Sequence, residues 1–396
     1  MKRILLLALL GLSAWVSQAQ RPSVVVRYHG QDSVHTSRIP GIATTPAGTL
    51  LAIYDARYES ARDLQGRMAI GLSRSTDGGR TWEPMRIVLD MGRWGRLPAK
   101  YNGVSDACIL VDSARNKIYV AGLWMHGLLD SEGRWIKGLT EESTRWQHQW
   151  AGRGSQPGLS PYQTCQFLIA ESSDDGQTWS YPRDITSATK DPSWWLYAPA
   201  PGKGIVTRDG VLVFPTQGRD STGMPFSNIT WSRDGGRTWH ASAPAASNTT
   251  ECAVGELSDG RLMLNMRNNR RTGRVVCTTS DLGAHWEVHP TSENALIEPV
   301  CMASLHRHTY TENGTARSLL LFCNPASRTE RRNMTLRVSR DDGMTWSRGI
   351  LLDSTAGYGY SCITSIDPQT IGVFFESSQE RILFQRITLD ELLREE

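Results

Sequence analysis

The chain has 396 residues, and its 43 Lys and Arg residues against 40 Asp and Glu residues give a formal net charge of +3. A chain of this length can form one large domain or two ordinary ones. The nearly balanced charge argues against nucleic acid or an anionic membrane as the main partner, and the 14 Trp and 36 Gly residues are typical of a β protein with many tight turns.

The N-terminus has the pattern of a secretory signal. Lys2 and Arg3 form a charged start, residues 4–12 form a short apolar run, and residues 17–19 offer small side chains for cleavage. The apolar run is too short to span a bilayer, and no second long run follows it. We therefore expect residues 1–19 to be a signal peptide and the mature chain to be exported, to the periplasm, the cell surface or the medium, without a membrane span.

A repeated turn is the strongest pattern in the sequence. The motif Ser/Thr-x-Asp-x-Gly-x-x-Trp occurs five times at quasi-regular spacing, at residues 75–82, 172–179, 232–239, 279–286 and 339–346. The Ser and Asp side chains can bind nearby backbone N–H groups, and Gly permits a positive φ. The Trp then begins the next strand and packs as a large wedge.

Strand-like runs precede these turns, at residues 68–73, 166–172, 226–232, 274–279 and 334–339. Each unit is therefore predicted to be a set of short antiparallel strands, as in a propeller blade. At about 40–60 residues per blade, the sequence predicts an all-β fold, a six-bladed β-propeller. No linker divides residues 20–396, so we expect one domain. The segment of about 124–166 is predicted to be a large inserted loop, whose Trp124, Trp135, Trp146 and Trp150 form either an apolar rim or buried packing.

The cysteines and the repeated turns do not indicate a metal site. The seven Cys residues are odd in number and widely spaced, without a CxxC motif, so they predict neither a disulfide framework nor a zinc site. Most are expected to be buried apolar residues in strands. The repeated turns carry too few acidic residues for calcium. We expect no metal and no cofactor.

One family resemblance is specific. The motif Ser37-Arg38-Ile39-Pro40 resembles the arginine motif that opens the catalytic domain of sialidases, although Ser37 stands where an aromatic residue is usual. The repeated turns resemble the Asp boxes of that family. The resemblance runs from Arg38 to the region of Glu376 and is strongest to bacterial exo-α-sialidases of glycoside hydrolase family 33. It implies that residues 20–396 form a catalytic propeller domain and that sialylated glycans are the partners.

The resemblance assigns three arginines to the substrate carboxylate. Sialic acid carries a carboxylate on its anomeric carbon, and Arg suits it because its guanidinium pairs with carboxylates in a bidentate way and stays charged. Arg38 matches the first member of the family's triad, and Arg267 matches the second. Arg331 matches the third, with Arg332 as the alternative.

The resemblance also assigns a nucleophile and its base. A carboxylate attacking beside the substrate carboxylate would meet like-charge repulsion, whereas a neutral phenol avoids it. Sialidases with a tyrosine nucleophile are a known exception among glycosidases, and the following Ser favours Tyr360 over Tyr358. Because a free Tyr has a pKa of about 10, it needs a base and nearby arginine charges. Glu251 resembles the base, with Glu256 as the rival.

The remaining assignments lie in the first third of the chain. Asp63 matches the acid/base residue, which protonates the leaving group and then activates water. Arg57 resembles a supporting arginine near the sugar carboxylate. Asp106 resembles an Asp near the N-acetyl and C4 groups, although a structural role is equally open.

The sequence therefore predicts a retaining exo-α-sialidase that acts through a covalent tyrosyl intermediate. A trans-sialidase or an anhydro-forming sialidase would use the same residues. A non-catalytic glycan-binding propeller is the alternative from a different class.

Overall fold

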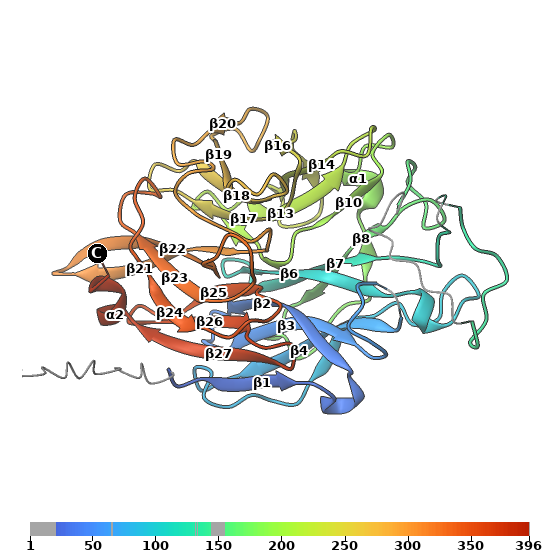
Figure 1. The fold of residues 1–396 in the computed structure, drawn as a ribbon, viewed down its shortest axis with the longest axis horizontal. Coiled ribbons are helices and arrows are strands. Elements are labelled where there is room, and N and C mark those ends of the chain that lie inside the picture. The colour runs from blue at the N-terminus through green and yellow to red at the C-terminus, as the bar shows by residue number, and fades with distance from the viewer. Residues whose placement is uncertain (1–20, 65, 131, 133, 144–154, 396) are drawn as a thin grey trace, which may run out of the picture.

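The computed structural model describes residues 21–64, 66–130, 132, 134–143 and 155–395. The predicted signal peptide, Trp146 and Trp150 lie outside the described residues. Strands make up nearly all of the regular structure, and they form six sheets within the described part (Figure 1). The prediction of a six-bladed β-propeller is confirmed.

The first three sheets come from the first two thirds of the chain. The first sheet contains β2 (Thr36–Thr44), β3 (Leu50–Arg57), β4 (Met68–Ser75) and β5 (Arg86–Leu89). The second contains β6 (Val104–Asp112), β7 (Lys117–Trp124), β8 (Gln166–Ser172) and β9 (Arg183–Asp184), with β11 (Gly202–Lys203) parallel to β6. The third contains β10 (Leu196–Pro199), β13 (Leu212–Arg219), β14 (Pro225–Ser232) and β15 (His240–Ala241), with β12 (Ile205–Val206) and β16 (Ala246–Ser247) beside them.

The last three sheets complete the ring. The fourth contains β17 (Thr249–Glu256), β18 (Leu262–Asn268), β19 (Val275–Thr279) and β20 (Glu287–Val288). The fifth contains β21 (Ser304–Glu312), β22 (Thr315–Pro325), β23 (Met334–Ser339) and β24 (Ile350–Asp353). The sixth contains β25 (Ser361–Asp367), β26 (Thr370–Glu376), β27 (Arg381–Thr388) and β1 (Val24–Tyr28). The helices are short, at α1 (Thr186–Thr189) and α2 (Leu389–Leu393).

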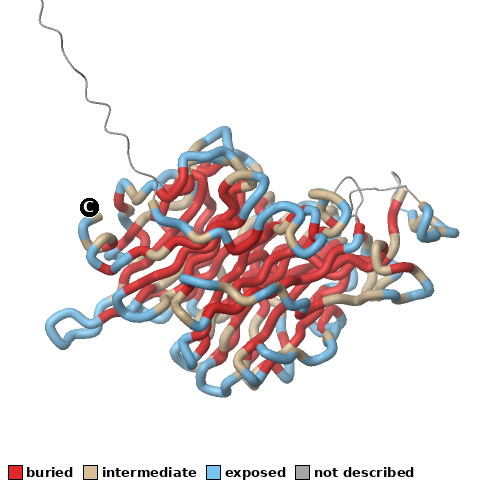
Figure 2. The backbone as a smooth tube through the Cα atoms, turned by 90° about the horizontal axis from the view of Figure 1, so that it is seen from below, coloured by how far each residue is buried: buried red, intermediate tan, exposed pale blue. Residues whose placement is uncertain are grey.

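The two ends of the chain close the ring. The N-terminal strand β1 pairs antiparallel with β27, so one sheet contains strands from both ends. Closure leaves only short sheet edges, which limits pairing with other chains. The strands are buried along most of their length, whereas the exposed positions gather in the turns (Figure 2). All seven cysteines are free and buried, whereas the sequence predicted burial for most of them. Among the described residues, no helix has the length and apolar character of a membrane span.

The repeated turns join the third and fourth strands of five sheets. In the first copy, Ser75 Oγ donates to Asp77 Oδ1 at 2.8 Å and accepts from the Gly79 N–H at 2.8 Å, while Asp77 Oδ1 accepts from the Thr81 N–H at 3.0 Å. The same three bonds recur in the other four copies. Gly79 has a φ of 85°, and a Cβ there would lie 2.0 Å from Phe384. The motif is thus a local folding signal and lies outside the central channel.

The Trp of each motif packs against neighbouring strands. Trp239 is 2% exposed, and its ring lies 5.3 Å from the ring of Phe214 and 6.2 Å from that of Tyr119 in the preceding sheet. We expect Trp239→Ala to lower the free energy of unfolding by about 3–5 kcal/mol, because it leaves a large cavity between two sheets. Urea denaturation measures this loss. Trp286→Ala is the matched control, because Trp286 is only partly buried; an equal loss in both variants would contradict the wedge role.

The long connection between β7 and β8 holds an aromatic cluster in its described part. Trp124 and His126 are buried, and Trp94 packs edge-on against both, with ring centroids 4.8 and 4.7 Å away. Trp135 packs near His126 at 6.4 Å. Trp124 therefore packs against the segment between β5 and β6, and Trp135 packs against His126 of the connection.

Candidate active site

Three inner strands carry a β-bulge at the same end. One extra residue interrupts the pairing of β2 after Arg38, of β6 after Ser105 and of β17 after Thr249. A bulge bends a strand and re-aims its side chains. Ile39 adopts a φ of 62° and Asp106 a φ of 55°, which is strained for a β-branched residue such as Ile39. The bulges bring Arg38, Asp106 and Glu251 to one mouth of the central channel.

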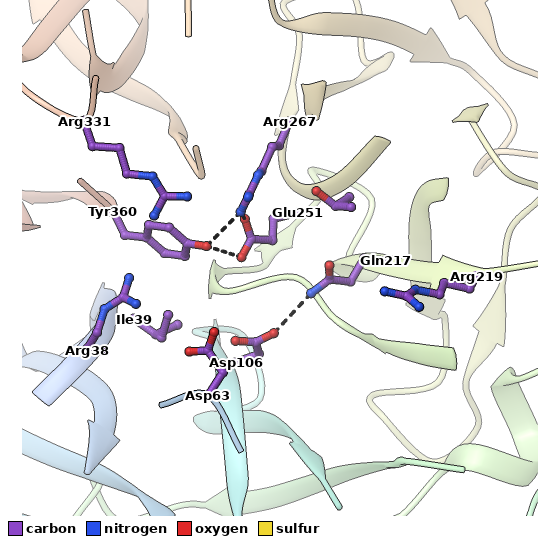
Figure 3. Close-up of a pocket in the computed structure, with 11 residues that line it drawn as sticks. Arg38, Ile39, Asp63, Asp106, Gln217, Arg219, Glu251, Arg267, Arg331 and Tyr360 are labelled. Atoms are coloured by element: carbon purple, nitrogen blue, oxygen red, sulfur yellow. Dashed lines mark hydrogen bonds and ion pairs between the residues drawn. The ribbon is translucent and has the colours of Figure 1, made fainter. Parts of the chain in front are cut away.

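These side chains line a cavity of about 270 Å³ (Figure 3). Seven of the eight residues selected from the sequence lie in its wall: Arg38, Asp63, Asp106, Glu251, Arg267, Arg331 and Tyr360. The wall also contains four residues that the sequence analysis missed: Ile39, Gln217, Arg219 and Thr250. In Figure 3, Asp63 and Asp106 lie across the cavity from Tyr360, Glu251 and Arg267.

Tyr360, Glu251 and Arg267 are in direct contact. The Tyr360 hydroxyl donates to Glu251 Oε1, while Arg267 Nη1 donates to the Tyr360 oxygen at 3.0 Å and pairs with Glu251 Oε2. Burial, followed by the charge of Glu251, raises the pKa of Tyr360 well above its usual value, although Arg267 and Arg331 act in the opposite direction. Burial and Glu251 therefore outweigh the two arginines, and the Tyr360 pKa stays above its usual value. Tyr360 is a neutral phenol whose proton already points at a base.

Arg38 is held by a carboxylate that the sequence analysis did not select. Its Nε and Nη2 donate to Glu376 Oε1 and Oε2 at 2.9 and 3.2 Å. Glu376 also accepts the backbone N–H groups of Ile39 at 2.9 Å and Tyr360 at 3.0 Å. Burial opposes the charge of Arg38, but Glu376 outweighs it and raises the Arg38 pKa. Glu376 therefore fixes both the Arg38 guanidinium and the backbone that carries Tyr360.

The structure separates the alternatives that the sequence left open. Arg331 lines the cavity and donates to two backbone carbonyls, whereas Arg332 pairs with Glu330 on the surface. The ring of Tyr358 lies under the Arg38 guanidinium at 3.9 Å, and it is Tyr360 whose hydroxyl meets Glu251.

The two glutamates of β17 are likewise separated. Glu251 lies at the bulged end of the strand, in the cavity wall. Glu256 lies at the other end, where it accepts the Arg208 backbone N–H. Only the position of Glu251 allows contact with Tyr360.

Asp63 lies on the loop between β3 and β4, with its side chain 41% exposed. Arg57 pairs with it and also donates to the Ala61 carbonyl at 2.8 Å and to Asp55 Oδ2 at 2.8 Å. Arg57 is 1% exposed and does not line the cavity. It therefore supports the Asp63 loop from behind.

Asp106 faces the cavity beside Gln217, whose Nε2 donates to Asp106 Oδ2 at 3.3 Å. Burial raises the pKa of Asp106 well above its usual value, and the negative charges of Glu251, Asp55 and Asp63 add to this effect. Gln217 and Arg219 are two positions apart on β13, so their side chains lie on the same face of the sheet. The sequence signal that could have identified them as site residues was a pair of polar residues at the end of a strand that begins with apolar residues.

Comparisons with known proteins agree with this geometry. A family model described as a BNR repeat-like domain matches residues 139–372. A sialidase of Bacteroides fragilis is 45% identical over 94% of this chain and 66% of its own length, and one of Micromonospora viridifaciens is 33% identical over 88% and 51%. This chain therefore spans about two thirds of the length of the Bacteroides fragilis protein and about half the length of the Micromonospora viridifaciens protein.

A solved structure gives the same result. A Hadza microbial sialidase is 44% identical and superposes with a TM-score of 0.86, covering 93% of this chain and 69% of that one. The chain belongs to the sialidase family with BNR (Asp-box) repeats.

Proposed function

We propose that this member of the sialidase family is a retaining exo-α-sialidase. It removes terminal α-linked sialic acids from glycoproteins, glycolipids and oligosaccharides through a covalent tyrosyl intermediate. The observation that carries this proposal is the contact of the Tyr360 hydroxyl with both Glu251 and Arg267, in a cavity that also holds Arg38, Arg331 and Asp63.

The charges of the cavity suit a monoanionic sugar. Glu376 pairs with Arg38, and Glu251 pairs with Arg267. Arg331 makes no ion pair with a carboxylate in the described part of the chain, since its guanidinium binds the carbonyls of Tyr358 and Val300 at 3.1 Å. This arginine cluster thus has one positive charge in excess, which supports binding of one substrate carboxylate.

The proposed reaction has two steps. In the first, Glu251 accepts the Tyr360 proton while the phenol oxygen attacks the anomeric carbon, and Asp63 protonates the departing oxygen. In the second, Asp63 accepts a proton from water, which attacks the same carbon. The bond to Tyr360 breaks, and Glu251 returns the proton to the phenoxide. Two inversions retain the anomeric configuration.

Other wall residues are proposed to recognise the rest of the sugar. The Asp106 carboxyl group and the Gln217 amide present hydrogen-bonding groups on the side of the cavity away from Arg331. They suit the neutral N-acetyl and hydroxyl groups of sialic acid. We also propose that the mature chain is exported, which agrees with a substrate on glycoproteins and glycolipids.

Glu376 is expected to act through Arg38. We expect Glu376→Gln to lower kcat/KM for a sialoside by about 10–100-fold, mainly through a higher KM, because an Arg38 without its partner loses its fixed orientation. Steady-state kinetics measure this change. Glu330→Gln is the control, since Glu330 pairs with Arg332 outside the cavity. An unchanged KM for Glu376→Gln would remove Glu376 from substrate positioning.

Product identification tests the proposed activity. The purified protein is incubated with α2,3-, α2,6- and α2,8-linked sialosides, and the products are separated by chromatography. Free sialic acid is the expected product. A sialyl group moved to another sugar, or an anhydro sugar, would identify the alternative activities, and no product from any of the three would refute the proposal.

A further inference from the structure

A second cavity, of about 380 Å³, lies at the opposite mouth of the central channel. Its wall contains the far ends of strands that also serve the candidate active site: Thr44 at the end of β2, which begins near Arg38, and Glu256 at the end of β17, which begins near Glu251. The proposed sialidase reaction makes no use of this cavity.

A directed chain of hydrogen bonds leads out of this cavity. Lys203 Nζ donates to His306 Nδ1 at 2.8 Å, because an ammonium group can only donate. His306 Nε2 must then carry the proton that is donated to Ser365 Oγ at 2.8 Å. The Ser365 hydroxyl in turn donates to His308 Nδ1 at 2.8 Å, and His308 Nε2 donates to the Pro368 carbonyl at 3.2 Å. Both histidines are therefore neutral, so neither adds a second positive charge beside that of Lys203.

The other charged groups of the cavity are already paired. Arg307 donates to Asp342 and to the Glu256 carbonyl, and Arg208 lies 3.9 Å from the Glu256 carboxylate. By contrast, Lys203 forms no ion pair within 4.0 Å with any carboxylate among the residues that the structure describes. The cations Lys203, Arg208 and Arg307 are therefore accompanied by only two carboxylates, those of Glu256 and Asp342. One positive charge is left in excess.

Lys203 is half-buried and has no counter-charge among the described residues. The His306 ring takes one of the three ammonium N–H groups, so two N–H groups remain for a ligand in the cavity. We propose that this cavity binds a small oxyanion with a single negative charge, a carboxylate or dihydrogen phosphate group, and that Lys203 is its charged ligand.

The surroundings of Lys203 set the pH range of this binding. Burial lowers the pKa of Lys203 to about 8. Burial also lowers the pKa of His306 and raises the pKa values of the facing thiols, Cys108 and Cys362, so these groups stay neutral near pH 8. Arg208, Arg307 and Glu256, the other charged groups that face the cavity, are held in the pairs described above. Lys203 is charged below about pH 8 and loses its proton above it, so anion binding weakens as the pH rises through 8.

The test uses acetate and inorganic phosphate as probes in isothermal titration calorimetry. The full chain carries Arg331→Met, which removes the excess positive charge of the candidate active site. At pH 7 this variant is expected to bind at least one probe saturably, and the stronger probe identifies the preferred oxyanion. Adding Lys203→Met is expected to weaken that binding at least tenfold. Equal affinity with and without Lys203, or no saturable binding of either probe, would overturn the proposal.

Two further measurements test the proposal without relying on the binding loss of the Lys203 variant. Acetate keeps its charge between pH 7 and pH 9, so in the Arg331→Met chain its affinity is expected to fall about tenfold over that range; an unchanged affinity would overturn the proposal without any Lys203 variant. Lys203→Met alone is expected to keep wild-type hydrolysis of an aryl sialoside. That result shows that the variant is folded and that the anion cavity is separate from the sialidase site.

Discussion

Tyr360→Phe is expected to lower kcat for sialoside hydrolysis by about 10³-fold or more, because the substitution removes the attacking oxygen. The arginines proposed to bind the substrate carboxylate stay in place, so binding of a sialic acid analogue is expected to persist. Steady-state kinetics and calorimetric titration with the analogue measure the two effects. The melting temperature shows whether the fold is intact.

Tyr358→Phe is the matched control. The Tyr358 ring lies under the Arg38 guanidinium, but its hydroxyl makes no hydrogen bond with the described residues. Loss of that hydroxyl is therefore expected to change kcat less than about threefold. Near wild-type activity of Tyr360→Phe would remove Tyr360 from the reaction.

Asp63→Ala is expected to show a loss that depends on the leaving group. For natural sialosides, whose sugar alkoxide needs a proton to depart, the first step is expected to slow by about 10²–10⁴-fold. For an aryl sialoside such as 4-nitrophenyl sialoside, the phenolate departs without that proton, so a much smaller loss is expected in the first step. Pre-steady-state kinetics with both substrates measure this difference.

Glu59→Ala is the control for this loop, because Glu59 is an exposed carboxylate four residues away. It is expected to hydrolyse both substrates like the wild type. If Asp63→Ala lost the same factor on both substrates, the acid role would be contradicted and Asp63 would be assigned to the loop structure instead.

The fold was predictable from the sequence because its signal is local. The three bonds among Ser75, Asp77, Gly79 and Thr81 lie within seven residues and recur in every copy. A pattern of this kind can be recognised without knowing which strands pair. The blade count then followed from the spacing of the copies and the length of a blade.

The site was predictable only in part. The family resemblance selected Tyr360 and Glu251, which the structure brings together. Glu376 was missed because its partner Arg38 is 338 positions away in the sequence, and no local pattern links them. The bulges that aim Arg38 and Asp106 depend on strand pairing, which the sequence does not encode in a simple motif.

Electrostatic properties were the least accessible from the sequence. The raised pKa of Tyr360 results first from burial, which is known only once the sheets surround the residue. The structure places Arg57 behind Asp63, because Asp55 and the Ala61 carbonyl hold its guanidinium there; its place relative to a sugar carboxylate stays a prediction. In both cases the residue type was visible in the sequence. The burial of Tyr360 and the direction of the Arg57 side chain were not.

The proposed reaction requires a covalent bond between Tyr360 and the sugar. The most direct measurement is peptide mass spectrometry after reaction with 2,3-difluorosialic acid, in which fluoride leaves from C2 and the fluorine at C3 slows hydrolysis of the glycosyl-enzyme. We predict that the peptide containing Tyr360 gains one fluorosialyl group and that the Tyr360→Phe chain gains none. A label on another residue, or an active enzyme that is inhibited without any label, would contradict the account.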